Sequence, residues 1–249
     1  MTDLERDLWI RRFTPGPPGT ARLVCFPHAG GSAPFYLPVS RALAPVADVL
    51  AVQYPGRQER RTEKCLDSIG ELADRIGELL LPLADRPLVL FGHSMGATLA
   101  FEVACRLREH GIVPRHLVVS GRRAPSRRRD EWVHTLDDAG IIAEMVALSG
   151  TDRAILGNPD LLRMILPALR GDYRAIETYR FPGGAPLSCP ITALTGDADP
   201  RVTPDEVEAW KEHTSDAFDL RVFPGGHFFL THHQEQILDL LRSRLETTS

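Results

Sequence analysis

The 249-residue sequence lacks several features that would assign it to particular protein classes. No apolar run approaches the roughly 20 residues that a helix needs to cross a bilayer. The acidic start, residues 1–7, has no apolar core of the kind found in secretory signals. The net charge of −4 gives no overall reason to expect a nucleic-acid partner. We therefore expect a cytoplasmic protein that contacts neither membranes nor nucleic acids.

Cysteine is also scarce. The four residues are widely separated and form no CxxC pair: Cys25, Cys65, Cys105 and Cys189. Three of them lie within or beside apolar runs, as small core residues do. This usage predicts free thiols in a reducing compartment, with neither a disulfide framework nor a metal site.

What the sequence does contain is the composition of a soluble globular protein, with 43% hydrophobic and 25% charged residues. Apolar runs of strand length alternate with helical patterns, which predicts one α/β domain, residues 1–249, with a mostly parallel sheet. We see no internal repeat. The expected strands are residues 23–26, 49–53, 88–91, 117–120, 191–195 and 220–223, and the expected helices are residues 35–43, 69–80, 97–110, 204–213 and 234–245.

One interval, residues 121–189, breaks this alternation, because it is much longer than a single crossover helix. Within it, residues 141–148 and 161–166 have the spacing of amphipathic helices. We predict a helical lid insertion at about 122–188, over the carboxyl edge of the sheet where open α/β sheets bind ligands. The alternative is a structural subdomain that does not contact the site.

The segment Gly92-His93-Ser94-Met95-Gly96 follows a buried strand and precedes an apolar helix. It has the G-x-S-x-G pattern of a nucleophile elbow, in which a serine sits on a sharp strand-to-helix turn. Glycine is needed on both sides because the turn brings backbone against backbone. The pattern predicts that Ser94 is a catalytic nucleophile in an α/β-hydrolase fold.

A serine nucleophile needs a general base, which in this fold follows later in the chain. His227 lies in a loop directly after the last expected strand, so its ring can point back across the sheet edge. His232 and His233 fall near the start of the last helix and are expected to face solvent. His93 lies inside the elbow, where its ring is expected to point away from a substrate. We therefore assign the base to His227.

The base in turn needs a carboxylate to orient it. Asp197 and Asp199 both lie in the loop after the strand at 191–195. Asp199 has cleared the strand end and can reach sideways toward a histidine loop, whereas Asp197 is placed to cap the turn. The residues themselves favour Asp199 and leave Asp197 open.

The developing oxyanion needs N–H donors. One is the backbone N–H of Met95, at the start of the elbow helix. The loop after an early strand normally supplies the other, and we assign it to Ala29 in the glycine-containing loop 26–31. We expect the neighbouring His28 to shape this loop and not to act in catalysis.

Several motifs, in order and covering nearly the whole chain, resemble the type II thioesterases of polyketide and nonribosomal-peptide assembly lines. They are FPHAGG at 26–31, QYPGR at 53–57, FGHSMG at 91–96, LPALRGDY at 166–173, GDAD at 196–199 and FPGGHFFL at 223–230. The resemblance places the catalytic acid at Asp199. It implies hydrolysis of acyl thioesters from the phosphopantetheine arms of acyl or peptidyl carrier proteins, in an editing role. The substrate carries that arm, so no cofactor is expected, and we expect a monomer.

Alternatives remain open at this stage. The family also includes thioesterases that release medium-chain fatty acids, and a lipase or carboxylesterase would use the same three side chains on oxygen esters. A hydrolase-fold module that only docks carrier proteins is a third interpretation, against which the intact Ser94, Asp199 and His227 argue. An arginine cluster is expected either to contact the acidic carrier or to be a solvated loop: Arg122, Arg123, Arg127, Arg128 and Arg129, with Arg57, Arg60 and Arg61 in another loop.

Overall fold

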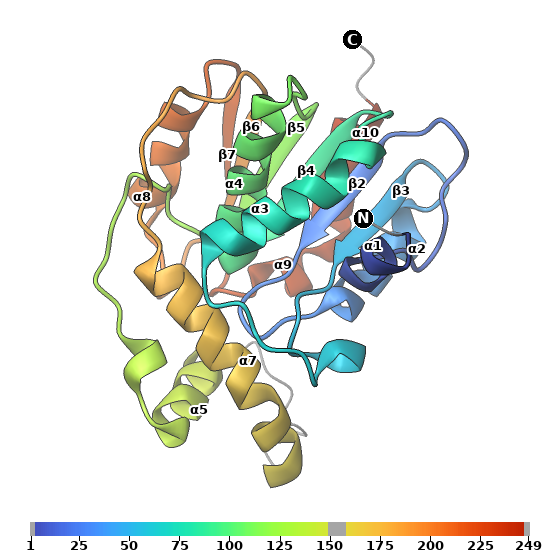
Figure 1. Ribbon diagram of the computed structural model, residues 1–249. Helices are drawn as coiled ribbons and strands as arrows, with labels where there is room; N and C mark the ends of the chain where they lie inside the picture. Colours follow the sequence, from blue (N-terminus) through green and yellow to red (C-terminus); the bar gives the residue numbers. More distant parts are fainter. Residues whose placement is uncertain (1–2, 149–157, 247–249) are drawn as a thin grey trace.

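A seven-stranded sheet crosses the molecule in the computed structural model, which describes residues 3–148 and 158–246 (Figure 1). The strand order is β1-β3-β2-β4-β5-β6-β7. β1 pairs antiparallel with β3, and the other neighbours pair in parallel. The strands are β1 Ile10–Arg11, β2 Arg22–Phe26, β3 Asp48–Val52, β4 Leu88–His93, β5 His116–Ser120, β6 Ile191–Gly196 and β7 Phe218–Phe223.

Helices cover both faces of this sheet. α3 (Ile69–Leu80) and α4 (Met95–Glu109) pack on one face, and α2 (Leu37–Leu43), α9 (Phe229–His232) and α10 (Gln234–Glu246) on the other (Figure 1). Side chains of β2 alternate between the two cores: Val24 and Phe26 join the first, Leu23 and Cys25 the second. This is the pattern of a strand buried on both faces, which explains its unbroken apolar sequence.

The expected strands and helices are present, with local differences. Helix 35–43 divides into a 3₁₀ turn, Ala33–Tyr36, and α2, because Pro38 has no N–H with which to continue an earlier helix. Helix 204–213 consists of α8 (Pro204–Glu208) and a 3₁₀ turn, Ala209–His213. Thr203 and Glu206 form the predicted capping box. The sequence did not predict α1 (Asp3–Trp9) or the two-residue edge strand β1.

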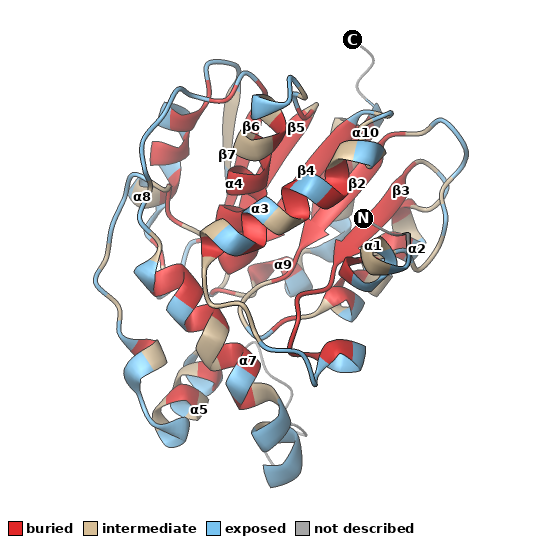
Figure 2. Ribbon diagram, viewed as in Figure 1, coloured by how far each residue is buried: buried red, intermediate tan, exposed pale blue. Residues whose placement is uncertain are grey.

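The insertion lies beyond the carboxyl ends of the strands (Figure 1). It contains α5 (Asp138–Ala147) and α7 (Pro159–Thr178), so the helix expected at 161–166 is part of a longer one. A separate small apolar core joins these helices: Val133, Ile141, Met145, Leu166, Leu169 and Tyr173. The first turns of α7 are exposed and its second half is buried against the body of the protein (Figure 2).

No helix among the described residues has the length and apolarity needed to span a membrane.

Candidate active site

Ser94 occupies the turn between β4 and α4 and has φ 55° and ψ −121°, a backbone conformation that non-glycine residues rarely adopt. The two flanking glycines make this turn possible. A Cβ on Gly92 would lie 2.0 Å from the carbonyl oxygen of Gly96, and one on Gly96 would lie 2.0 Å from the carbonyl oxygen of Phe26. The G-x-S-x-G pattern is therefore a steric requirement of the turn that presents Ser94 above the sheet.

His227 and Asp199 form a hydrogen-bonded chain with Ser94. The Nε2 atom of His227 lies 3.0 Å from Ser94 Oγ, and Nδ1 lies 2.9 Å from Asp199 Oδ2. The His227 and Asp199 side chains are almost fully buried. The second carboxylate oxygen of Asp199 accepts a hydrogen bond of 2.8 Å from the backbone N–H of Arg201. Both oxygens of Asp199 are thus fixed, and one of them faces the imidazole.

Asp197 has a different partner. Its Oδ1 accepts a 2.8 Å hydrogen bond from the backbone N–H of Gly225, in the loop that carries His227. The two loops also approach closely at Gly196, where a Cβ would lie 2.3 Å from the Gly225 carbonyl oxygen. Of the two aspartates that the sequence offered, the structure brings Asp199 to the imidazole, and Asp197 joins the acid loop to the histidine loop.

The loop 26–31 after β2 also lies beside Ser94. Two buried phenols hold its backbone: Tyr36 donates to the carbonyl of Phe26 (2.9 Å) and Tyr54 to the carbonyl of Pro27 (3.1 Å). Ala29 from this loop and Met95 at the start of α4 line one small cavity together with Ser94. The two residues expected to supply the oxyanion donors are therefore both beside the serine.

Two further histidines lie near His227. The ring of His93 lies 5.0 Å from that of His227, and the ring of His28 lies 6.0 Å from that of His93. His93 is fully buried, its Nδ1 lies 3.0 Å from Ser120 Oγ, and it does not line the cavity beside Ser94. Its ring therefore points away from that cavity, as expected. Burial, and then the charge of His227, lowers the pKa of His28 to about 3 and that of His93 well below 6.5. Both rings are neutral near pH 7 and do not oppose a positive charge on His227.

The family follows from comparison with known proteins. A family model described as a thioesterase domain matches residues 21–245. The chain belongs to the thioesterase family.

Relatives of this thioesterase are themselves named thioesterases, two of them for a biosynthesis or a biosynthetic cluster. It is 48% identical to thioesterase PikA5 of Streptomyces venezuelae, over 100% of this chain and 90% of the relative. It is 58% identical to a probable cadicidin biosynthesis thioesterase of Streptomyces griseus, of which it spans only 63% of the length. The solved structure of BorB, a type II thioesterase from the borrelidin biosynthetic cluster, superimposes with a TM-score of 0.92 at 54% identity, covering 96% of this chain and 98% of that one. The α/β-hydrolase fold expected from the sequence is thereby confirmed.

The insertion of the thioesterase lines the cavity beside Ser94. The cavity there measures about 40 Å³, and lid residues Leu148, Tyr173, Ile176 and Glu177 complete its wall. Such a volume holds about three water-sized groups. An ion pair joins Glu144 of α5 to Arg201, two residues after Asp199. The insertion is thus part of the site, because it supplies side chains to the wall of this cavity.

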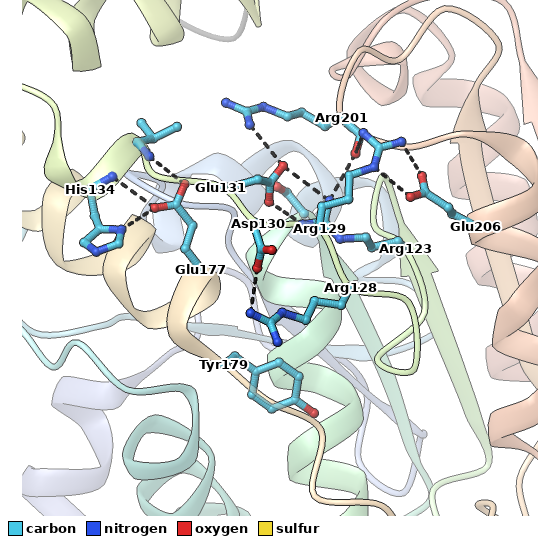
Figure 3. A network of polar contacts seen from close by, with 12 residues as sticks. Arg123, Arg128, Arg129, Asp130, Glu131, His134, Glu177, Tyr179, Arg201 and Glu206 are labelled. Atoms are coloured by element: carbon cyan, nitrogen blue, oxygen red, sulfur yellow. Dashed lines mark hydrogen bonds and ion pairs between the residues drawn. The ribbon is translucent and has the colours of Figure 1, made fainter.

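The predicted arginine cluster is largely paired with carboxylates (Figure 3). Glu131 lies between Arg123 and Arg201, and Arg129 forms two hydrogen bonds of 2.6 and 2.7 Å with Glu206. Outside this group, Arg127 pairs with Glu212 and Arg128 with Asp130. The fifth arginine, Arg122, lines the cavity beside Ser94, and burial lowers its pKa to about 9. These contacts hold the start of the lid in place, with the Arg127 and Arg128 side chains exposed. Contact of the cluster with an acidic carrier stays a prediction.

Proposed function

We propose that this thioesterase hydrolyses acyl thioesters through an acyl-enzyme on Ser94. The observation that carries the proposal is the hydrogen-bonded chain from Asp199 through His227 to Ser94, at the elbow of an α/β-hydrolase and beside the helical insertion. A serine hydroxyl is a weak nucleophile near neutral pH, and an oriented imidazole activates it.

In the first half-reaction, His227 Nε2 takes the proton of Ser94 Oγ as that oxygen attacks the thioester carbonyl carbon. The backbone N–H groups of Ala29 and Met95 donate to the resulting oxyanion. When the intermediate collapses, the C–S bond breaks and His227 gives its proton to the leaving sulfur. Water then attacks the acyl-enzyme by the same route, releasing a carboxylic acid and restoring Ser94. Asp199 stabilises the imidazolium in both halves.

The substrate we propose is an acyl group on the phosphopantetheine arm of an acyl or peptidyl carrier protein, removed as an editing step. The support is twofold. Relatives at 48% and 54% identity are named thioesterases, and the second of these, BorB, comes from the borrelidin biosynthetic cluster. The small volume of the cavity beside Ser94, about 40 Å³, suits a short acyl group better than a long chain.

The remaining expectations belong to the same proposal. All four cysteines are free thiols, which suits the cytoplasm. The reaction scheme uses only side chains, backbone amides and water, so it needs no cofactor. The monomeric state is testable by light scattering.

The deciding experiment compares kcat/KM on acyl-carrier proteins bearing C2 to C12 chains, on the matching acyl-pantetheines, and on p-nitrophenyl esters. We expect acyl-carrier thioesters with short chains to give the highest values. Preference for oxygen esters would indicate a carboxylesterase, and a maximum at C8 to C12 would indicate a medium-chain thioesterase.

A second measurement tests the nucleophile. A fluorophosphonate should label the parent at Ser94, and Ser94→Ala should abolish both labelling and hydrolysis. Absence of labelling in the folded parent would reject the enzyme proposal and leave a docking module.

A further inference from the structure

The lid helix α7 is joined to the body of the protein by a buried ion pair. Arg57 contacts the Asp172 carboxylate through both terminal nitrogens, at 2.6 and 2.8 Å. Asp172 is fully buried and Arg57 nearly so. Burial by itself lowers the pKa of Arg57, and the charge and hydrogen bonds of Asp172 more than reverse this, so the guanidinium is charged. The two residues are 115 positions apart in the sequence.

This ion pair holds the loop beside Ser94. The backbone N–H of Gly30 donates to Asp172 Oδ2 at 2.7 Å, and Arg57 Nη1 donates to the carbonyl of Gly31 at 3.2 Å. Within the loop, the N–H of Gly31 donates to the carbonyl of His28 at 2.9 Å. The hydrogen bond to Asp172 therefore fixes the peptide group between Ala29 and Gly30. The N–H of Ala29 belongs to the peptide group directly before it.

The energetics point to a role in positioning. A buried ion pair often contributes little net stability compared with apolar residues of similar size, although removing one partner is strongly destabilising. A preorganised hydrogen-bond donor, by contrast, is worth about 10²–10³ in kcat at an oxyanion hole. Gly30 has φ 74°, and glycine adopts both signs of φ readily, so local sterics do not fix the loop at this residue and its hydrogen bonds must do so.

We propose that Asp172 and Arg57 are positioning residues that set the oxyanion loop only when α7 is seated. Asp172 belongs to the lid and accepts directly from the loop, so moving α7 away removes the acceptor of Gly30. The loop that carries the Ala29 N–H is then held only by residues outside the lid, which are Tyr36, Tyr54 and Arg57. Lid closure and assembly of the oxyanion hole are one event. This inference rests on the proposed serine mechanism.

Two double variants test the proposal without leaving a buried charge unpaired. In Arg57→Met/Asp172→Leu the pair is apolar and Gly30 has no acceptor. In Arg57→Gln/Asp172→Asn the pair is neutral, but the amide oxygen at position 172 still accepts from Gly30. We expect the apolar variant to lose about 10²–10³ in kcat. We expect the amide variant to recover at least tenfold of that loss. In both variants KM should stay near that of the parent, because the substitutions do not line the cavity beside Ser94.

The matched control is Asp138→Asn, which breaks the exposed lid ion pair between Asp138 and Arg170 without touching the oxyanion loop. Its kcat should remain within threefold of the parent. Equal kcat in the two double variants would overturn the proposal, as would an apolar variant as active as the parent.

Hydrogen exchange on the unmodified protein supplies a test that does not depend on the variants folding. Peptides covering 27–33 and 166–175 should exchange through a common opening, with equal free energies at Gly30 and in the second half of α7. Exchange at Gly30 much slower or faster than in α7 would refute the coupling. An inactive, unlabelled parent would instead refute the proposed function, so the two failures are distinguishable.

Discussion

Replacing Asp199 by Asn should invert the polarity of the hydrogen-bonded chain, because the environment decides which way the new amide faces. Oδ1 of Asp199 accepts a hydrogen bond of 2.8 Å from the backbone N–H of Arg201. In the variant, the amide oxygen of the asparagine keeps this position, because an NH₂ group cannot accept. Its NH₂ group then faces Nδ1 of His227, 2.9 Å away. Nδ1 must therefore accept a hydrogen bond, and the proton of the neutral ring moves to Nε2. Nε2 then donates to Ser94 Oγ, whereas a general base must accept the proton of that hydroxyl.

The size of the effect follows from this tautomer and from the lost negative charge. The equivalent change in a well-studied serine protease costs about 10⁴ in kcat. At about 1.4 kcal/mol per tenfold change, this is about 5.5 kcal/mol of transition-state stabilisation. We expect the same order here, because Asp199 is buried and in direct contact with the ring. KM should change little, since the aspartate does not line the cavity that receives the acyl group.

The assay is release of free thiol from an acyl-pantetheine, with Asp197→Asn as the matched control. In that variant the amide oxygen still accepts from the N–H of Gly225, so kcat should stay within about tenfold of the parent. If Asp199→Asn kept kcat within tenfold while Asp197→Asn lost several orders of magnitude, the acid would be Asp197 and the tautomer reasoning would fail.

Three further predictions concern the turn, the lid and acid stability. Gly96→Ala places a Cβ about 2.0 Å from the backbone oxygen of Phe26, so urea unfolding should show a loss of more than about 3 kcal/mol. Leu148→Ala enlarges the cavity beside Ser94 and should shift the preferred acyl chain by about two carbons, at roughly 0.8 kcal/mol per methylene, with fluorophosphonate labelling unchanged. An altered melting temperature with an unchanged chain profile would contradict this. Burial lowers the pKa of His116 to about 4 from 6.5, so the unfolded chain binds the extra proton and stability falls as pH drops from 6.5 to 4. His116→Gln should reduce the slope of the unfolding free energy against pH by about 1.4 kcal/mol per pH unit between these two values. The same slope for the parent and the variant in urea unfolding at pH 4 to 7 would refute the prediction.

The parts of this protein that the sequence predicted are those governed by local rules. Apolar runs of strand length and a capping box depend on neighbouring residues, and they placed the strands of the parallel sheet and the start of α8 correctly. In a parallel sheet the carboxyl ends of the strands share one edge, so motif order alone brought Ser94, Asp199 and His227 into one region. The structure adds the distances, which no spacing rule provides.

The features that the sequence did not predict depend on tertiary packing. β1 is two residues long and exists only because it pairs with β3 at the sheet edge. The contact of Asp172 with Gly30 spans 142 positions, and no local pattern marks either residue as its partner. The pairing of the lid arginines was missed for the same reason: Arg129 meets Glu206, which is 77 residues away.

The lid contacts both loops that hold the reacting groups, through Glu144 with Arg201 on the acid side and Asp172 with Gly30 on the other. An acyl group that fits only beneath a raised α5 and α7 would therefore occupy a site whose loops are no longer braced. Such a thioester would bind and remain uncleaved, and would compete with shorter substrates. Discrimination between chain lengths would then be expressed in kcat and not in KM, and poor substrates would behave kinetically as inhibitors.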